Sequence, residues 1–242
     1  MAIKMSFVLG IDTSNYTTSV SAYDGKKMIY RKKLLPVKEG EKGIRQSDAV
    51  FHHTVQLPEL LSDLCSEISS DISAVGVSVK PSNQEGSYMP CFLTGISVAK
   101  SLSSALKIPI YEFSHQDGHI AAALYSAKRT DLIGEQFIAF HISGGTSQGV
   151  LVTPNKNYFS TRLICDSLDL KAGQAIDRIG IELGLQFPCG SELEKLALCS
   201  DKNFDNIKVF HRDALFSLSG VENKCKKMIE NGEPPCDIAL YC

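Results

Sequence analysis

Residues 6–23 (SFVLGIDTSNYTTSVSAY) have the pattern of a strand, a polar turn and a returning strand. An apolar run leads into a turn rich in hydroxyl side chains, and alternating apolar and polar residues follow it. Asp24-Gly25 is typical of a hairpin turn, so the next strand is expected at residues 28–35. Residues 137–152 (FIAFHISGGTSQGVLV) repeat the strand, turn and strand. This duplication predicts an α/β chain made of two related halves.

The remaining residues alternate between helical and strand patterns. Apolar residues at helical spacing predict helices over residues 47–69, 92–106, 115–127 and 169–184. Short strands are expected at residues 74–79 and 109–113, and a charged loop at residues 38–42. Because the pattern restarts after residue 130, we expect two domains, residues 6–130 and 131–242.

The composition is that of an ordinary globular protein, with 242 residues, 43% of them apolar and 21% charged. A net charge of −2 gives no strong attraction to nucleic acid, so RNA would need a local patch or a partner protein. The sequence has no apolar run long enough to span a membrane, and its N-terminus lacks a signal-peptide pattern. Both features favour a cytoplasmic location. The eight cysteines are scattered without a C-x-x-C pair, which favours free thiols.

Two stretches carry candidate chemistry. In residues 113–120 (FSHQDGHI), His115 and His119 are four residues apart and would share one face of a helix, within reach of one metal ion. Two exposed helical histidines would give the same spacing. In the turn after residue 142, backbone N–H groups and hydroxyls of glycine, serine and threonine suit a phosphate, although such residues also form plain hairpin turns.

Further blocks follow in order: ISGGTSQ at 142–148, LDLKAGQAIDR at 168–178, LGLQFPCG at 183–190 and FSLSG at 216–220. With the histidine pair they resemble the TsaD family, the tRNA threonylcarbamoyladenosine synthases once described as glycoproteases. Residues 10–14 (GIDTS) resemble the family's G-I-E-T-S, and residues 95–100 (GISVAK) its G-x-S-x-A-K helix. The resemblance implies an actin-like, sugar-kinase-like ATPase fold with two subdomains around a nucleotide cleft.

The resemblance also implies roles. His115 and His119 would hold a divalent metal (Zn, Fe or Mn, which two histidines do not distinguish) that polarises the carbonyl of threonylcarbamoyl-adenylate for attack by the tRNA adenosine amine. The expected nucleotide-side residues are Ser143, Gly144, Gly145 and Thr146 at the phosphate, Asp177 at the ribose and Gly190 at the nucleoside. No catalytic residue is assigned beyond the metal ligands. Expected partners are tRNA, bound directly or through a complex, and a related tRNA-modification protein in a hetero- or homodimer.

The chain departs from the family at several positions. Residues 15–18 (NYTT) replace C-D-E-T, so two carboxylates are absent, and residues 79–84 (VKPSNQ) replace the T-x-G-P-G loop. Thr146 stands where the family has histidine, and Leu170 and Gln174 stand where it has acidic residues. The family also continues beyond its F-S-F-S-G block, with a further nucleotide loop and a third metal ligand. We therefore expect the second subdomain to be incomplete.

Three functions agree with these features to different degrees. The first is a threonylcarbamoyl transferase, and the second is a non-catalytic paralog that binds adenine nucleotide or serves as a scaffold. A metalloprotease is disfavoured, because Gln116 occupies the place of the glutamate base in H-E-x-x-H. Outside these motifs, His52 and His53 are expected to be structural or on the surface, and His141 to lie in the core.

Overall fold

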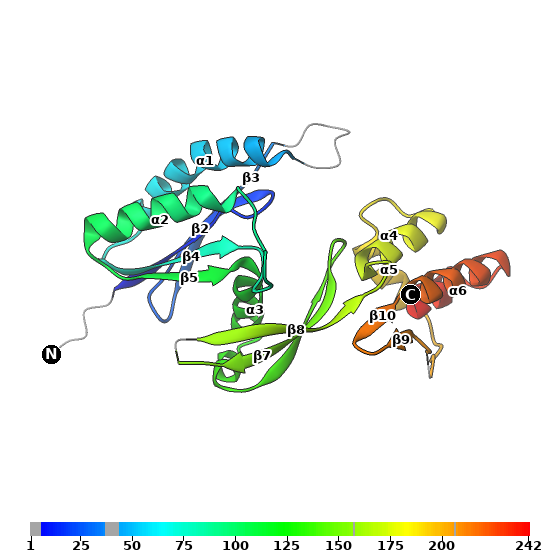
Figure 1. Ribbon diagram of the computed structural model, residues 1–242. Coiled ribbons are helices and arrows are strands. Elements are labelled where there is room, and N and C mark those ends of the chain that lie inside the picture. Colours follow the sequence, from blue (N-terminus) through cyan, green and yellow to red (C-terminus); the bar gives the residue numbers. More distant parts are fainter. Residues whose placement is uncertain (1–5, 37–43, 157, 206) are drawn as a thin grey trace. The chain divides into compact units, whose positions relative to one another are not determined.

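The computed structural model describes residues 6–36, 44–156, 158–205 and 207–242 (Figure 1). The chain forms two compact units, residues 1–130 (the first unit) and residues 131–242 (the second unit). Each unit has its own five-stranded mixed sheet. The loop expected at residues 38–42 lies outside the described residues.

The first unit has the sheet order β3-β2-β1-β4-β5. Its strands are β1 (Phe7–Asp12), β2 (Thr17–Tyr23), β3 (Met28–Leu34), β4 (Ile72–Lys80) and β5 (Ile110–Ser114). Its helices are α1 (Gln46–Ser66), α2 (Phe92–Leu106) and α3 (His115–Ser126). The β1–β2 and β2–β3 pairs are antiparallel, whereas β1, β4 and β5 run parallel. The carboxyl ends of these three parallel strands therefore lie at one edge of the sheet.

The first unit is held together by apolar residues that alternate along its strands. Phe7, Leu9 and Ile11 of β1 are buried on one face and pack with Leu57 and Leu64 of α1. Helix α1 covers β2 and β3, α2 covers β4, and the two helices pack side by side (Figure 1). Each buried leucine contributes about 1.5–3 kcal/mol relative to an exposed one. The core thus fixes the strand ends at which α3 begins.

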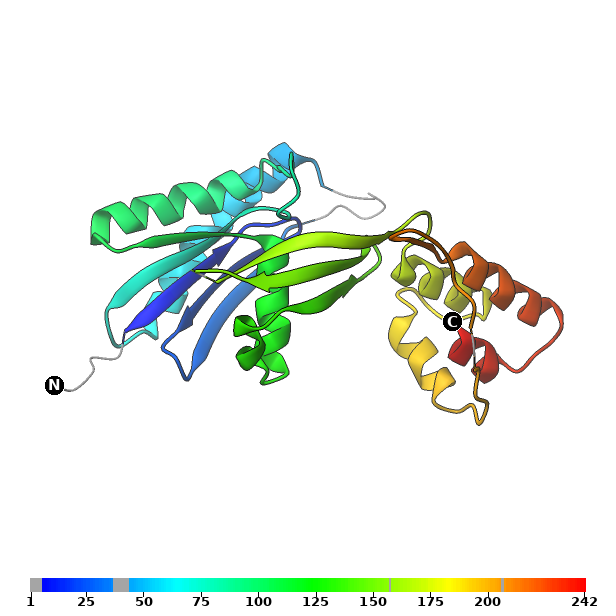
Figure 2. The same cartoon turned by 60° about the horizontal axis from the view of Figure 1, so that its bottom comes forward.

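The second unit has the sheet order β6-β7-β8-β10-β9. Its strands are β6 (Phe137–Ile142), β7 (Ser147–Pro154), β8 (Phe159–Ser167), β9 (Phe210–Arg212) and β10 (Leu215–Ser217). Its helices are α4 (Ala172–Glu182), α5 (Gly190–Ala197), α6 (Ser219–Glu230) and α7 (Pro235–Tyr241), preceded by the 3-10 turn η1 (Thr130–Gly134). Figure 2 shows these four helices gathered beyond one end of the long strands β7 and β8. Ile179 of α4, Met228 of α6 and Ile238 of α7 form their common core.

Several expected features differ in detail from the structure. Helix α4 begins at Ala172, not at residue 169, because Lys171 is its extended N-cap residue. His141 is half-buried in β6 and is not a core residue. By contrast His53 is fully buried in α1. All eight cysteines are free thiols. Within the described residues, no helix combines the length and apolar character needed to cross a bilayer.

Candidate functional site

Helix α3 starts at the edge where the parallel strands end, and its first turn is capped by side chains. The Ser114 hydroxyl accepts a hydrogen bond from the Asp117 backbone N–H (3.1 Å), and the Asp117 carboxylate accepts one from the Ser114 N–H (2.9 Å). This reciprocal capping box satisfies two backbone donors at the helix start. It places His115 at the first helical position and His119 one turn later.

The structure brings the two predicted metal ligands together. The Nε2 atoms of His115 and His119 lie 2.9 Å apart, and the ring centroids are 4.4 Å apart. His119 is exposed, and the side chain of His115 is 33% exposed. Two nitrogens bound at right angles to one metal, each at about 2.1 Å, would be separated by about 3.0 Å. The observed separation suits two neighbouring ligands of one ion.

Asp12, at the end of β1, lies behind this pair. Its Oδ2 atom is 2.9 Å from Nδ1 of His115, and its Oδ1 atom accepts hydrogen bonds from the backbone N–H of Ser14 (2.9 Å) and from the Ser14 hydroxyl. Burial raises the pKa of the Asp12 carboxyl, but the hydrogen bonds from His115, Ser14 and Ser78, together with the positive charge that a protonated His115 carries, outweigh burial. The pKa is therefore held well below its ordinary value of 3.8.

Sequence reasoning missed Asp12 as a site residue. It noticed only that the aspartate stands where the family has glutamate, because 103 residues separate Asp12 from His115. The sequence nevertheless contained a signal. Asp12 is a carboxylate at the end of one buried strand, and His115 directly follows another strand. In parallel sheets the carboxyl ends of neighbouring strands form the usual ligand-binding edge.

The segment that replaces the family's T-x-G-P-G loop is attached to the same helix. The Asn83 amide donates to both carboxylate oxygens of Asp117 (2.9 and 3.1 Å), and the backbone N–H of Gln116 donates to the Pro81 carbonyl (3.0 Å). Gln116 is buried. Among the described residues, no group of three or more His, Cys, Asp and Glu side chains is arranged to hold a metal. The helix thus offers two converging imidazole nitrogens.

In the second unit, the predicted phosphate turn is a compact loop between β6 and β7. The Ser143 hydroxyl accepts from the backbone N–H groups of Gly145 (3.2 Å) and Thr146 (3.0 Å), and the Ser143 N–H donates to the Thr146 carbonyl (2.7 Å). Gly144 and Gly145 are exposed. Several amides that were expected to receive phosphate are therefore hydrogen bonded inside the loop.

This loop is packed on the first turn of α4. The Gly173 N–H donates to the Ser143 carbonyl (3.1 Å), and the Ala172 N–H donates to the Ser147 hydroxyl (2.8 Å). A Cβ atom on Gly173 would lie 2.6 Å from the Gly144 nitrogen. Glycine at this position allows the two backbones to touch.

Asp177 and Gly190 are also brought close to each other. The Asp177 carboxylate on α4 accepts a hydrogen bond from the Cys189 N–H at 2.9 Å, and Gly190 follows directly as the first residue of α5. The two predicted nucleoside residues thus meet where α4 and α5 pack. All six nucleotide-side residues belong to the second unit, whereas both histidines belong to the first.

Asp169 links two of the motif blocks, which sequence reasoning did not foresee. It accepts hydrogen bonds from the Ser217 hydroxyl (2.6 Å) and the Leu218 N–H (3.1 Å). Burial raises the pKa of Asp169, but these bonds and those from Ser219 and Leu170 prevail, and the pKa lies below its ordinary 3.8. Asp169 thereby fastens the end of β8 to the start of α6.

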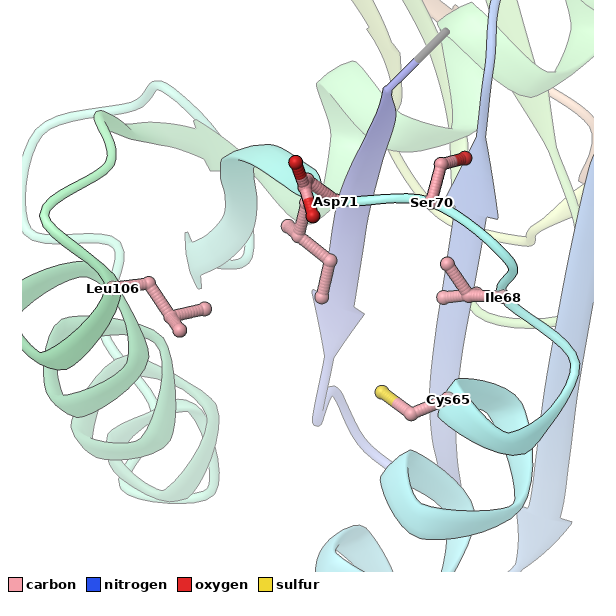
Figure 3. A pocket seen from close by; sticks show the side chains of 6 residues that line it. Cys65, Ile68, Ser70, Asp71 and Leu106 are labelled. Atoms are coloured by element: carbon pink, nitrogen blue, oxygen red, sulfur yellow. The ribbon is translucent and has the colours of Figure 1, made fainter.

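The open pocket shown in Figure 3 lies elsewhere in the first unit. It has a volume of about 510 Å³ and is lined by Cys65, Ile68, Ser70, Asp71, Ile72 and Leu106. These residues come from the ends of α1 and α2, from the start of β4 and from the loop that joins α1 to β4. Because β4 and β5 run parallel, the pocket lies at the sheet edge opposite His115. It contains none of the predicted site residues.

Comparison with known proteins identifies relatives of the whole chain. A sequence profile of the TsaD family, tRNA N6-adenosine threonylcarbamoyltransferase, matches residues 29–241. The threonylcarbamoyltransferase of Buchnera aphidicola (subsp. Schizaphis graminum) is 30% identical over 93% of this chain and 66% of its own length. That of Bacillus subtilis is 30% identical over 84% of this chain and 56% of its own. The chain thus spans about 56–66% of the length of these relatives.

Solved structures agree on the fold. Full-length HypF in a phosphate- and nucleotide-bound form has a TM-score of 0.55 and 12% identity, covering 98% of this chain and 36% of HypF. HypF of T. kodakarensis also has a TM-score of 0.55, with 10% identity over 99% of this chain and 38% of its own. This likeness gives the actin-like ATPase fold. On the match of its sequence from residue 29 to residue 241, the chain is a member of the TsaD family of tRNA-modification transferases.

Proposed function

We propose that this chain transfers a threonylcarbamoyl group from threonylcarbamoyl-adenylate to the N6 amine of the adenosine next to the tRNA anticodon. His115 and His119 would hold a divalent metal for this reaction. The observation that supports the proposal most strongly is the convergence of their Nε2 atoms at 2.9 Å on the capped start of α3. At this distance the two rings share a hydrogen bond, and a metal ion bound between them would replace its proton.

The residues present fit a metal ion in their donor chemistry. Imidazole nitrogens bind Zn, Fe and Mn, and a carboxylate behind one imidazole is the usual support of a metal-binding histidine. Asp12 lies in that supporting position, with Oδ2 2.9 Å from Nδ1 of His115. The ion would supply Lewis-acid polarisation of the threonylcarbamoyl carbonyl.

The protein's own groups would bind and orient the adenylate. The exposed Gly144 and Gly145 would leave room for the phosphate beside the loop, and the Asp177 carboxylate, which lies next to Gly190, would meet the nucleoside. In the reaction the N6 nitrogen forms a bond to the carbamoyl carbon, the bond from that carbon to the phosphate oxygen breaks, and the amine loses a proton as AMP leaves. Because AMP is a good leaving group, little general-base chemistry is required of the protein.

Binding of tRNA is proposed to involve a partner protein. The chain carries 25 Lys and Arg against 27 Asp and Glu, so its overall charge does not attract a polyanion. A basic surface on a related tRNA-modification protein, in a heterodimer or a larger complex, would provide that attraction.

A second candidate is a non-catalytic paralog that binds adenine nucleotide. It is favoured by the first hairpin loop, in which residues 15–18 (NYTT) carry no carboxylate. It is also favoured by the loop at Ser143, whose amides bond within the loop. In this case the nucleotide would bind to the second unit, while no acyl group would be transferred.

The two candidates are separated by measuring metal content and acyl transfer on one preparation. Threonylcarbamoyl-adenylate and unmodified tRNA are supplied, with and without the usual bacterial partner proteins. We expect near-stoichiometric metal and modified tRNA from the wild-type protein. Both should fall at least about 10-fold in the His115→Ala/His119→Ala protein, because its first coordination sphere is lost.

The matched control is His211→Ala, which removes an exposed histidine from β9 in the second unit. It should leave metal content and transfer unchanged. A folded wild-type protein that holds no metal and yields no product, but still binds adenine nucleotide, would replace the transferase proposal with the second candidate.

A further inference from the structure

We propose that Asp12 is a positioning residue, which holds the imidazole proton of His115 on Nδ1 and so presents the bare Nε2 nitrogen toward His119. This inference rests on the proposed metal-binding function and adds to it a residue that lies 103 positions away from the histidine pair. It concerns how the site is prepared before any ligand arrives.

The first argument is the arrangement of hydrogen bonds around the carboxylate. Oδ1 of Asp12 is committed to Ser14, because it accepts from both the backbone N–H and the hydroxyl of that residue. Oδ2 lies 2.9 Å from Nδ1 of His115. A carboxylate can only accept at such a contact, so the donor is the Nδ1–H group of His115. The bonds to Ser14 also prevent the carboxylate from rotating away.

The second argument is the chemistry of neutral imidazole. A neutral ring carries a single proton, and the bond made by one nitrogen decides the state of the other. With its proton on Nδ1, His115 has a lone pair on Nε2, which accepts the hydrogen bond from the Nε2–H group of His119 at 2.9 Å. The Ser14 hydroxyl, 3.4 Å from the same nitrogen, already donates to Asp12 and does not compete for it.

The third argument is rigidity. Asp12 ends β1, which pairs with β2 on one side and β4 on the other, and its side chain is only 23% exposed. His115 begins α3, whose first turn is fixed by Ser114 and Asp117. The hydrogen bond between Asp12 and His115 therefore joins two rigid elements, β1 and α3. A ligand pair supported in this way keeps its orientation without help from the metal.

The test uses the full-length protein and the variant Asp12→Asn. In this variant the side-chain oxygen of the asparagine would accept the hydrogen bond from the Ser14 N–H. The side-chain NH₂ group would then face Nδ1 of His115. The amide then donates to Nδ1 and shifts the ring proton to Nε2, the nitrogen required for the metal. Side-chain ¹⁵N–¹H correlation spectra of the metal-free proteins, recorded at a pH where His115 is neutral, report the position of this proton directly.

We expect the Nδ1–H form of His115 in the wild-type protein and the Nε2–H form in Asp12→Asn. Zn²⁺ affinity, measured by competition with a chelator, should fall about 10- to 100-fold in the variant, as is typical when a supporting partner of a ligand is lost. Asp12→Glu, which restores a carboxylate, should recover part of the Nδ1–H population and of the affinity. Asp24→Asn, which alters a half-buried turn aspartate of the same unit at the far end of β2, should change neither.

The same His115 proton position in the wild-type protein and a folded Asp12→Asn, with Zn²⁺ affinities within twofold, would overturn the inference and leave the proposed function standing. Backbone amide spectra establish that each variant is folded, and the Glu variant repeats the test should the Asn variant unfold. Wild-type protein that binds none of Zn²⁺, Fe²⁺ and Mn²⁺ would overturn the proposed function. Even then, the position of the ring proton of His115 in the metal-free wild-type and Asp12→Asn proteins would decide whether Asp12 orients this histidine.

Discussion

At the scale of single residues, the buried histidine of α1 makes stability depend on pH. His53 is fully buried, and its Nδ1 lies 2.8 Å from the Thr18 hydroxyl. Its Nε2 atom is buried with no hydrogen-bond partner among the described residues. Burial lowers the pKa of His53 below its ordinary value of 6.5, although neighbouring groups partly oppose this. The folded protein therefore keeps this ring neutral at a pH where the unfolded chain takes up a proton.

The first unit should accordingly lose stability as the pH falls through 6.5 toward the lower pKa of the folded state. The urea midpoint of wild-type protein, followed between pH 7.5 and 5.5, should fall more steeply than that of His53→Gln. His211→Gln, which changes an exposed histidine, should keep the wild-type slope. Equal slopes in the wild-type protein and His53→Gln would refute this account.

The same scale shows how far the sequence predicts the site. His115 and His119 could be paired from their spacing, because positions four apart share a helix face. Asp12 could not be added, because its contact depends on the order of strands β1, β4 and β5. Burial of His53, but not of its neighbour His52, likewise depends on how α1 rotates onto β2. Local spacing identifies partners on one element, whereas contacts between elements require the tertiary fold.

At the scale of elements, the contact between the Ser143 loop and α4 depends on the missing side chain of Gly173. In Gly173→Ala the new methyl group would lie 2.6–2.8 Å from backbone atoms of Gly144 and Ser143, and backbone cannot move aside as a flexible side chain can. We expect the loop to separate from the helix and the second unit to lose about 1–3 kcal/mol of unfolding free energy. Adenine-nucleotide affinity should fall as well.

The matched control for this change is Gly220→Ala in α6, where an added Cβ meets nothing within 4 Å. It should unfold at the wild-type midpoint or slightly above it, because alanine is favoured over glycine in helices. Thermal unfolding and a nucleotide titration provide both measurements. A Gly173→Ala protein as stable as Gly220→Ala would show that the loop tolerates the added methyl group.

Elements with a strong periodic pattern were the ones predicted well. The bounds expected for α2 and β6 are those observed, and α1 and α3 differ by a few residues at most. Strand β8 and helices α5 to α7 were not assigned. The short α5 and α7, of eight and seven residues, provide too few turns for a clear apolar stripe. Helix α7 packs through Ile238 against Ile179 and Met228, and α5 packs on α4 and α7.

At the scale of the whole molecule, the division near residue 130 separates the two groups of candidate residues. The first unit contains Asp12 and both histidines within one sheet and three helices. We expect residues 1–130, expressed alone, to fold cooperatively and to keep the Nδ1–H form of His115. A fragment of residues 1–109, which lacks β5 and α3, should fail to fold cooperatively. Amide correlation spectra that show an unfolded 1–130 fragment would contradict this prediction.

The capping box at the start of α3 has a consequence for the energetics of ligand binding. Ser114 and Asp117 close the first turn in the absence of any ligand, and Asn83 ties that turn to the loop before it. An incoming ion or substrate would find both histidines already ordered, with little conformational entropy left to lose. Binding at this turn would then leave the backbone conformation of α3 unchanged, and amide hydrogen exchange along α3 would slow only by the factor that mass action gives to a ligand bound to the closed helix.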